Sequence, residues 1–289
     1  MTLDEVSSPG PAAVAYAARI DAVAEQRARL QGQVIDDSRW DRNAPSYRFD
    51  PRRDPETNLR LLSSYIEPDD EVIEVGGGAG RIALPLALQC AKVTNVEPSA
   101  GMRAEFESLA QEADIHNAHL MASRWPPGDI GPVGDVAMTE DVTHFIRDIV
   151  PFIEALVAAA RRRVIISIWA FPPPAWDAEL WRIVFDEPQV GVPGHTELLP
   201  VLWEMGILPD VLMLPESFSL PERLPRTRDE AIQFALDQVS PVNREEAASR
   251  VEARFDELFR FEAGVYRPSW RPDAPGMLIT WETPTADLL

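Results

Sequence analysis

Glycine recurs at alternate positions in a short run, Gly76, Gly78 and Gly80, which directly follows the apolar segment 71–75. Glycine is needed where the backbone turns with a positive φ, or where a ligand must reach the main chain without a Cβ in the way. The pattern predicts a strand before this run and a helix after it, and the first N–H groups of a helix lack partners within the helix. A strand, a glycine loop and a helix in this order are typical of a loop that binds a nucleotide-like cofactor.

Two cofactor classes use such a loop, and the residue types separate them. The dinucleotide fingerprint G-x-G-x-x-G/A needs Gly or Ala at position 81, where Arg81 stands. The pattern E-x-G-x-G-x-G instead matches Glu74 and the three alternating glycines at every position. This run resembles motif I of the class I S-adenosyl-L-methionine (SAM) methyltransferases, in which the loop lies along the methionine part of the cofactor. A tight turn between a strand and a helix, with no ligand, is the alternative interpretation.

A carboxylate ends the next predicted strand, residues 92–96, at Glu97. A carboxylate at this place can accept hydrogen bonds from both hydroxyls of a ribose, which suits adenosine. The resemblance implies that Glu97 binds the ribose and that Met102 packs on the adenine. Pro98 and Gly77, which lie in the same two loops, are included in the predicted cofactor site.

The sequence departs from the family after the third strand, residues 118–122. Many members carry an Asp there that contacts the adenine amino group, whereas this chain has Ser123, Arg124 and Trp125. Ser123 or the backbone could replace that contact. Trp125 could lie against the adenine face or pack in the core, and both interpretations stay open.

The fourth strand, residues 135–139, leads into Glu140, Asp141 and, after two further residues, His144. Ligands of open α/β sheets bind outside the carboxyl ends of the strands, so these side chains are expected near the site. The resemblance implies that this loop faces the transferred methyl group. His144 could act as a general base or support the following helix, and His195 is a second candidate for a base.

An N-terminal stretch completes the predicted site. The run from Trp40 to Tyr47 resembles the W-x-x-x-A-x-x-Y segment that covers the cofactor in small-molecule methyltransferases, although an amphipathic lid helix without ligand contact would look the same. The predicted catalytic residues are His144 and Tyr47. The predicted cofactor-binding residues are Glu74, Gly76, Gly77, Gly78, Gly80, Glu97, Pro98, Met102, Ser123, Arg124, Trp125, Glu140 and Asp141, and no metal site is predicted.

Alternating apolar runs and helical periodicities indicate the elements that must position these residues. Strands are expected at 71–75, 92–96, 118–122, 135–139, 164–169, 210–214 and 276–282, and helices at 11–33, 57–65, 79–90, 99–113, 145–161, 175–185, 196–205, 227–238 and 243–262. Together with the resemblance they predict a Rossmann-like α/β fold: a seven-stranded, mostly parallel sheet with an antiparallel last strand, flanked by helices. The predicted units are a cap (1–56), a methyltransferase core (57–217), a helical lid insertion (218–275), and the final strand with a tail (276–289).

Composition excludes several chemistries. The chain has 27 Lys+Arg against 47 Asp+Glu and a formal net charge of −20, which disfavours binding to nucleic acid. The run Arg161 to Arg163 has a simple structural explanation at the end of a predicted helix. Lys92 is the one lysine, which argues against a P-loop or a Schiff-base enzyme, and the single Cys90 excludes internal disulfides and cysteine-ligated clusters. With no apolar run long enough to span a bilayer, a cytoplasmic protein is expected.

The resemblance implies a SAM-dependent methyltransferase that transfers a methyl group to an N, O or C nucleophile of a small molecule by in-line displacement, with S-adenosyl-L-homocysteine (SAH) as the product. The sulfonium is already activated, so such catalysis needs mainly alignment and desolvation. A non-catalytic SAM-binding regulatory or scaffold module and a protein methyltransferase are the alternatives. The sequence leaves open whether the protein is a monomer or a homodimer.

Overall fold

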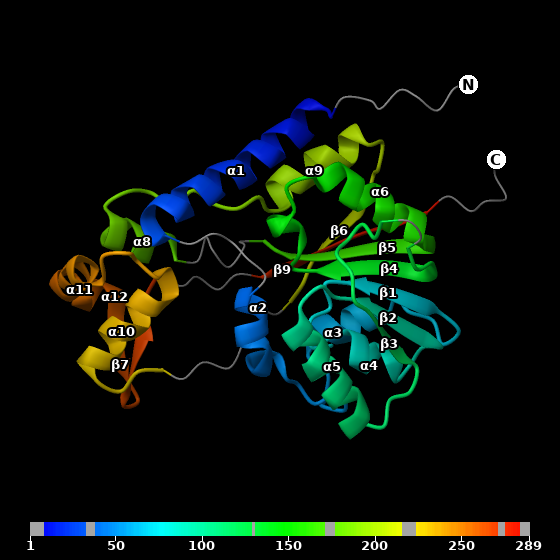
Figure 1. The fold of residues 1–289 in the computed structure, drawn as a ribbon, viewed down its shortest axis with the longest axis horizontal. Coiled ribbons are helices and arrows are strands. Elements are labelled where there is room, and N and C mark those ends of the chain that lie inside the picture. Colours follow the sequence, from blue (N-terminus) through cyan, green and yellow to red (C-terminus); the bar gives the residue numbers. More distant parts are fainter. Residues whose placement is uncertain are drawn as a thin grey trace.

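The structure is a computed structural model of the chain, and it describes residues 9–32, 38–128, 131–170, 177–215, 224–270 and 275–283 (Figure 1). The helices are α1 (Pro11–Gln31), α2 (Ser38–Asn43), η1 (Ala44–Tyr47), α3 (Thr57–Ser63), α4 (Ala83–Ala87), α5 (Ala100–Glu112), η2 (Thr143–Phe145), α6 (Ile149–Ala159), α8 (Ala178–Phe185), α9 (His195–Glu204), α10 (Arg228–Val239), α11 (Arg244–Ala253) and α12 (Phe255–Leu258). The strands are β1 (Glu71–Val75), β2 (Lys92–Val96), β3 (Ala118–Met121), β4 (Gly134–Glu140), β5 (Ala160–Trp169), β6 (Asp210–Met213), β7 (Phe259–Glu262), β8 (Val265–Pro268) and β9 (Gly276–Glu282).

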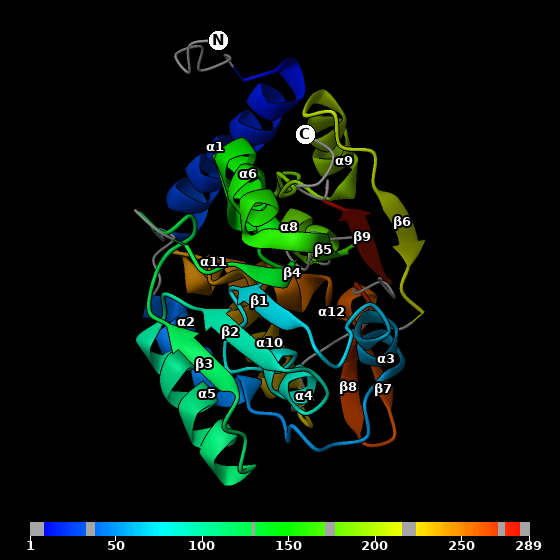
Figure 2. The ribbon, with the colours of Figure 1, turned by 90° about the vertical axis from the view of Figure 1, so that its right-hand side faces the viewer.

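The central sheet has seven strands in the order β3-β2-β1-β4-β5-β9-β6 (Figure 2). The first five strands pair in parallel, whereas β9 runs antiparallel to both of its neighbours, β5 and β6. This arrangement confirms the predicted fold class. All seven predicted strands are present, and β5 begins at Ala160 rather than at residue 164.

Helices cover both faces of the sheet, because successive side chains of each strand point to opposite sides. Ile73 and Val75 of β1 pack with α1, α6 and α9 on one face, and Val72 packs with α3, α4 and α5 on the other. Figure 1 shows the same two layers above and below the strands. Parallel strands that are covered in this way are apolar on both faces, which fits the continuous apolar run of β5.

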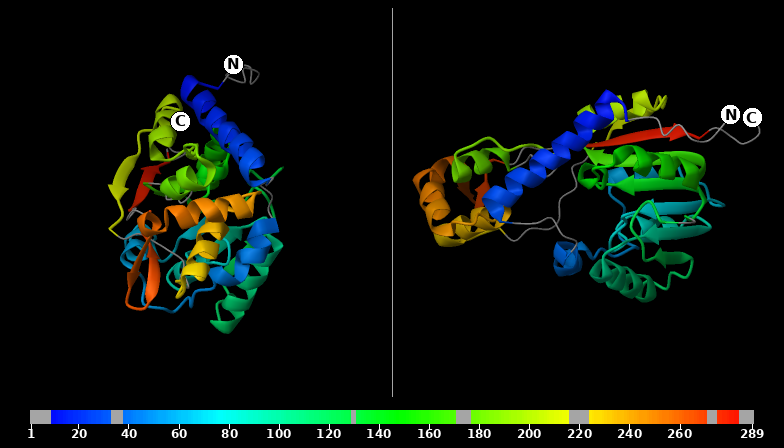
Figure 3. Two further views of the ribbon diagram at one scale, coloured as in Figure 1. Left: turned by 90° about the vertical axis from the view of Figure 1, so that its left-hand side faces the viewer. Right: turned by 45° about the horizontal axis from the view of Figure 1, so that its top comes forward.

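A separate apolar cluster lies beyond the edge at which β1 to β5 end (Figures 1 and 3). It consists of α8, α10, α11, α12 and the β7–β8 hairpin, and we call it the helical module. Its centre is aromatic: the rings of Phe255 and Phe259 stack with centroids 5.0 Å apart, and Trp270 meets Phe259 edge-on at 5.1 Å. The module includes α8, which the chain supplies between β5 and β6. The predicted unit boundaries are not decided by this packing and stay a prediction.

The helix predicted at 243–262 is wrong in its second half. Helix α11 ends at Ala253, and the chain continues through α12 into the β7–β8 hairpin. The two-residue connection explains the difference, since Ala263 and Gly264 have φ of 51° and 83°. Positive φ at both positions defines the type I′ turn, whose twist suits two antiparallel strands.

Other helix boundaries also differ, and two of these differences have a clear cause. Helix α4 is shorter than the predicted helix 79–90, because Gly80 has a φ of 88° and cannot lie in a right-handed helix. The arginine run does not end a helix either: Arg161 and its two successors lie in β5. Arg161 pairs with Asp135 at 2.8 Å on the neighbouring strand, so the run neutralises carboxylates at the amino-terminal edge of the sheet. The start predicted for the helix at 175 lies outside the described residues.

Among the helices that the structure describes, none combines the length and the apolar character needed to cross a membrane.

Candidate cofactor-binding site

The glycine loop between β1 and α4 has the backbone that its composition predicts. Gly76, Gly78 and Gly80 have φ of 73°, 54° and 88°, a region that other residues rarely adopt. The Gly76 N–H donates to the carbonyl of Val96 at 2.8 Å, and the Gly80 N–H donates to the carbonyl of Gly77 at 2.9 Å. The loop is therefore tied both to itself and to β2.

The space beside each glycine separates structural from ligand-facing positions. A Cβ on Gly76 would lie 2.6 Å from Val142, and one on Gly80 would lie 2.6 Å from the ring of Phe106. A Cβ on Gly77 would meet the Glu74 carboxylate at 2.5 Å. A Cβ on Gly78 would instead meet only Met102 Sδ, at an ordinary 3.6 Å. Of the loop glycines, Gly78 is thus the one with open space beside its Cα. Met102, the residue predicted beside the adenine, borders that space.

Strand β2 holds this loop in place through polar side chains. The buried Asn95 accepts a hydrogen bond from Gly77 N–H at 3.1 Å and donates to the Gly78 carbonyl at 3.0 Å. Glu97 Oε2 accepts from Gly78 N–H at 3.0 Å, while its Oε1 accepts from Ser99 N–H at 2.8 Å. The structure therefore brings the predicted ribose acid directly beside the predicted loop. Pro98, the next residue in the predicted site, is exposed.

The N-terminal segment is fastened over the start of α5. Asp41 Oδ1 accepts from the Ser99 hydroxyl at 2.7 Å and from the Gly101 N–H at 2.8 Å, and these two bonds hold the pKa of Asp41 below its usual range. Ser99 in turn caps α5 by accepting from Met102 N–H at 3.1 Å. The predicted cap thus contacts the same helix start that follows Glu97.

Glu74 is buried with 1% of its surface exposed, and its Oε2 has no hydrogen-bond partner. Burial, reinforced by the charge of Glu140, raises the pKa of Glu74 to about 8. A carboxyl group with this pKa is mostly protonated at neutral pH. Because a Cβ on Gly77 would lie 2.5 Å from this carboxyl group, Glu74 fills the space beside Gly77.

Arg81, the residue that distinguishes this loop from a dinucleotide fingerprint, links three elements. It pairs with Glu56 at 2.9 Å through Nη1 and with Glu140 through Nη2. Although burial opposes it, the pair with Glu140 holds the pKa of Arg81 above its usual value. Arg81 thus joins the segment before α3 to the end of β4.

Asp141 follows β4 in a conformation that is unusual for a residue other than glycine, with a φ of 54°. Its N–H donates to the carbonyl of Ser167 at 2.9 Å, and its carboxylate accepts from the backbone and the indole N–H of Trp169. Burial and the charge of Glu140 raise the pKa of Asp141 well above its ordinary range, against the opposing effects of Arg81 and Trp169. Both predicted acids of this loop therefore lie at the carboxyl edge of the sheet.

The two predicted catalytic residues are placed differently. His144 is 2% exposed, and its ring centroid lies 4.0 Å from that of Phe145. Tyr47 lies at the end of η1, edge-on to Trp40 with centroids 6.2 Å apart. These ring contacts do not decide whether His144 or Tyr47 takes part in catalysis, so both catalytic roles stay predictions. His195 begins α9, and its ring is partly buried.

After β3, the Ser123 hydroxyl donates to the Arg124 carbonyl at 2.8 Å, and Arg124 is exposed. The Trp125 indole donates to the Phe152 carbonyl at 3.2 Å and packs with the cluster around α6. This contact agrees with the packing interpretation of Trp125, while its contact with adenine stays a prediction.

Some residues around the site carried no prediction. Asn95 is a fully buried polar residue of β2, and a polar residue inside a predicted interior strand is a signal that could have identified it. Trp169 ends β5, and its contact with Asp141 depends on the register of β4 against β5, which a single sequence does not show. Asp41 lies far from α5 in the chain, and only the folded structure brings the two together.

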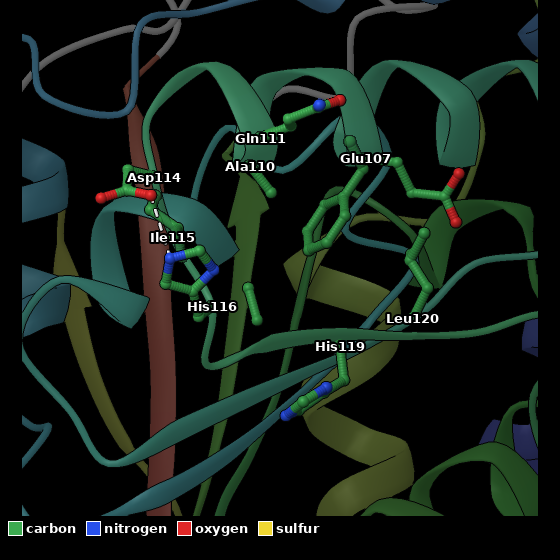
Figure 4. Close-up of a pocket in the computed structure, with 10 residues that line it drawn as sticks. Glu107, Ala110, Gln111, Asp114, Ile115, His116, His119 and Leu120 are labelled. Atoms are coloured by element: carbon green, nitrogen blue, oxygen red, sulfur yellow. Dashed lines mark ion pairs between the residues drawn. The ribbon is translucent and has the colours of Figure 1, made fainter.

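A shallow cavity of about 470 Å³ lies elsewhere, between α5 and the start of β3 (Figure 4). Its walls include His116, which pairs with Asp114 at 2.9 Å, and His119. None of the predicted site residues lines this cavity. Within the described ranges, no cluster of three or more His, Cys, Asp or Glu side chains is arranged to hold a metal ion.

Comparisons with known proteins identify the fold. No protein-family model matches the sequence. An uncharacterized protein of Haemophilus influenzae is 28% identical over 152 residues, which make up 52% of this chain and 56% of that protein. The chain thus spans little more than half the length of the curated relative it matches.

Solved structures match over most of the chain. A SAM-dependent methyltransferase of Geobacter sulfurreducens, crystallised in complex with SAH, matches 86% of this chain and all of its own, at 14% identity and a TM-score of 0.50. YjhP of E. coli covers 84% of this chain and 99% of its own (12% identity, TM-score 0.52), and YcgJ of Bacillus subtilis covers 78% and 97% (16%, 0.51). The chain has the Rossmann-like fold of the class I methyltransferases.

Proposed function

We propose that this chain is a SAM-dependent methyltransferase that acts on a small molecule. The observation that carries the proposal is the pairing of Gly78 with Glu97: the loop glycine with an open outer face donates its N–H to the carboxylate that ends β2. The fold is shared with a methyltransferase that was crystallised with SAH, which supports the same cofactor here.

The residues present suit SAM. Each carboxylate oxygen of Glu97 accepts one hydrogen bond, from Gly78 or from Ser99, and a carboxylate oxygen can accept more than one, so we propose that Glu97 also accepts from the two ribose hydroxyls. Met102 bounds the open face of Gly78 and offers a polarizable thioether to an adenine ring. The bound cofactor supplies an activated methyl group, so the protein must mainly align a nucleophile with it and exclude water.

The helical module and the N-terminal segment provide the means to exclude water. The module lies beyond the carboxyl edge of the sheet (Figure 3), and α2 contacts the start of α5 through Asp41. We propose that both form the lid over the site, in a cytoplasmic enzyme whose acceptor is an N, O or C nucleophile. A lid of this size suits a small-molecule acceptor better than a polymer.

Replacing Gly78 tests the proposal. A Gly78→Val side chain would project into the open face of the loop, so we expect SAM and SAH binding, measured by isothermal titration calorimetry, to weaken by about 100-fold or more. Gly206→Val is the matched control, because Gly206 also has a positive φ (76°) and no neighbour within 4 Å, but lies between α9 and β6, away from the glycine loop and outside the helical module. This control is expected to bind both ligands as the wild type does.

Three results would count against the proposal. Binding that survives Gly78→Val would show that the loop is not the cofactor site. Failure of the wild type to bind either SAM or SAH would contradict the proposed cofactor. Tight binding of both, without SAH formation from any acceptor in a metabolite screen, would favour a non-catalytic SAM-binding module.

A further inference from the structure

Strand β6 forms one outer edge of the central sheet, and none of the described strands pairs with its free side (Figure 2). On its inner side, the Leu214 N–H donates to the Gly276 carbonyl next to β9 at 2.9 Å. Hydrogen-bonded pairs alternate along antiparallel strands, so Val211 and Met213 direct their N–H and C=O groups away from β9. A strand edge of this kind is a template for pairing with another strand.

Two prolines limit this free edge. Pro209 lies two residues before Val211, and Pro215 lies two residues after Met213. These positions share the outward direction in an extended chain, but proline has no N–H to donate. The free N–H groups of the edge are therefore those of Val211 and Met213, and a strand that pairs here has a short, defined length.

The surface around this edge is apolar. Val211 and Met213 lie opposite residues of β9 that pack under α9, so their side chains lie on the sheet face that α9 covers. Both are about half exposed, since they lie on the outermost strand. Trp203 of α9 is 55% exposed, and Leu208, in the connection from α9 to β6, is 83% exposed. We call Trp203, Leu208, Val211 and Met213 the β6 patch.

The β6 patch carries little charge in a strongly charged chain. Residues 205–215 contain one charged residue, Asp210, whereas charged residues make up 26% of the chain and give it a net charge of −20. Most of so acidic a surface repels a second copy, and the β6 patch does not. Its four side chains expose on the order of 450 Å², so two patches would bury about 900 Å² before the backbone is counted, close to the range of about 1,200–2,000 Å² for specific interfaces.

We propose that the β6 patch binds the β6 patch of a second copy of this chain, with the two β6 strands antiparallel about a two-fold axis at Leu212. In this register Val211 faces the partner's Met213, and the two residues exchange two hydrogen bonds. The symmetry repeats these bonds, so both free N–H groups of each edge are used. Moving the axis to Val211 would put the partner's Pro209 opposite Met213, and moving it to Met213 would put the partner's Pro215 opposite Val211.

The same symmetry separates the charges and keeps the proposed cofactor sites open. Asp210 lies opposite the partner's Leu214, so the two Asp210 carboxylates are about 14 Å apart along the strands, farther than the screening length of about 8 Å. The side chains of Val211 and the partner's Met213 lie on the same face, between the two copies of α9. Because the strands are antiparallel, the carboxyl edges of the two sheets face opposite ends of the dimer.

The mass of the protein in solution tests the proposal. In sedimentation velocity runs at about 1–100 µM, we expect the wild type to approach twice its mass of 32.2 kDa. Val211→Lys puts a charge into the patch and is expected to weaken the dimer by about 100-fold or more. Val242→Lys is the control, because Val242 is 67% exposed but lies between α10 and α11, and this variant should associate as the wild type does. A wild type that stays monomeric at 100 µM, or a Val211→Lys variant that dimerises like the wild type, would overturn the proposal.

Disulfide cross-linking tests the register and does not depend on a charged substitution. Leu212 and the partner's Leu212 form a non-hydrogen-bonded pair on the axis, with Cα atoms about 4.5 Å apart, a spacing that a disulfide can bridge. We expect Leu212→Cys to give a covalent dimer under mild oxidation, seen on a non-reducing gel, whereas the native Cys90 is buried. Leu208→Cys is the control: it is more exposed, but about 27 Å would separate it from its copy along the strands, so it should cross-link far more slowly. Equal or faster cross-linking of Leu208→Cys, or none of Leu212→Cys, would overturn the proposed pairing.

Discussion

At the scale of single residues, Glu74 links the glycine loop to pH. Its pKa is raised from 4.5 to about 8, so the folded state binds a proton that the unfolded chain releases above pH 4.5. The stabilisation from this proton is complete below pH 4.5 and is lost as the pH rises through about 8. A shift of this size corresponds to a few kcal/mol of unfolding free energy.

We therefore expect Glu74→Gln to abolish this part of the pH dependence. The unfolding free energies of both proteins are measured by urea denaturation at several pH values. Between pH 5 and pH 9, that of the wild type should fall by on the order of 4 kcal/mol relative to that of Glu74→Gln. Glu71→Gln, at the exposed start of the same strand beside Arg161, is the control and should keep the wild-type slope. Parallel curves for the wild type and Glu74→Gln would contradict the raised pKa.

At the scale of elements, the glycine loop owes its shape to β2. The buried Asn95 satisfies Gly77 N–H and the Gly78 carbonyl, and Asn95→Ala would leave both groups without that partner. We expect this change to lower the unfolding free energy by about 2–4 kcal/mol and to weaken SAM binding, as measured by denaturation and calorimetry. Thr94→Ala, whose side chain points to the other face of the sheet, serves as the control. Equal stability of the two variants would show that Asn95 does not hold the loop.

Much of this architecture was predictable because most strands of the central sheet are short, largely apolar runs between turns. The β7–β8 hairpin was not, because residues 243–262 are rich in Glu and Arg and also fit helical spacing. Tertiary packing selects the strand here: Phe259 is 4% exposed, and its ring lies between those of Phe255 and Trp270. At the site, the meeting of Glu97 with Gly78 followed from the order of the first two strands. The contact of Trp169 with Asp141 requires the register of β4 against β5.

At the scale of the whole molecule, α1 connects the core with the helical module (Figure 3). It has 21 residues and is therefore about 31 Å long. Its first half packs on the core, where Glu204 accepts from Ala12 N–H at 2.8 Å and Tyr16 is fully buried. Its second half reaches the module, where Gln31 donates to the Val239 carbonyl at 2.7 Å and Leu30 joins the apolar cluster. One rigid helix thus sets the position of the proposed lid relative to the site.

Gln26 is the polar centre of this connection, and its replacement tests the role of α1. It is 7% exposed, donates to Glu187 at 2.8 Å and to the Pro188 carbonyl at 2.9 Å, and accepts from Val190 N–H at 2.8 Å. Gln26→Ala leaves these groups unsatisfied, so we expect amide hydrogen exchange in α8 and α10 to accelerate by about tenfold, with α6 and β5 unchanged. Arg19→Ala, on the same helix, removes only an exposed pair with Glu197 at 3.7 Å and should leave exchange in the module unchanged. If α1 positions the lid, Gln26→Ala should also weaken the protection from amide hydrogen exchange that SAM confers on the module. Equal protection in Gln26→Ala and Arg19→Ala would show that other contacts hold the module.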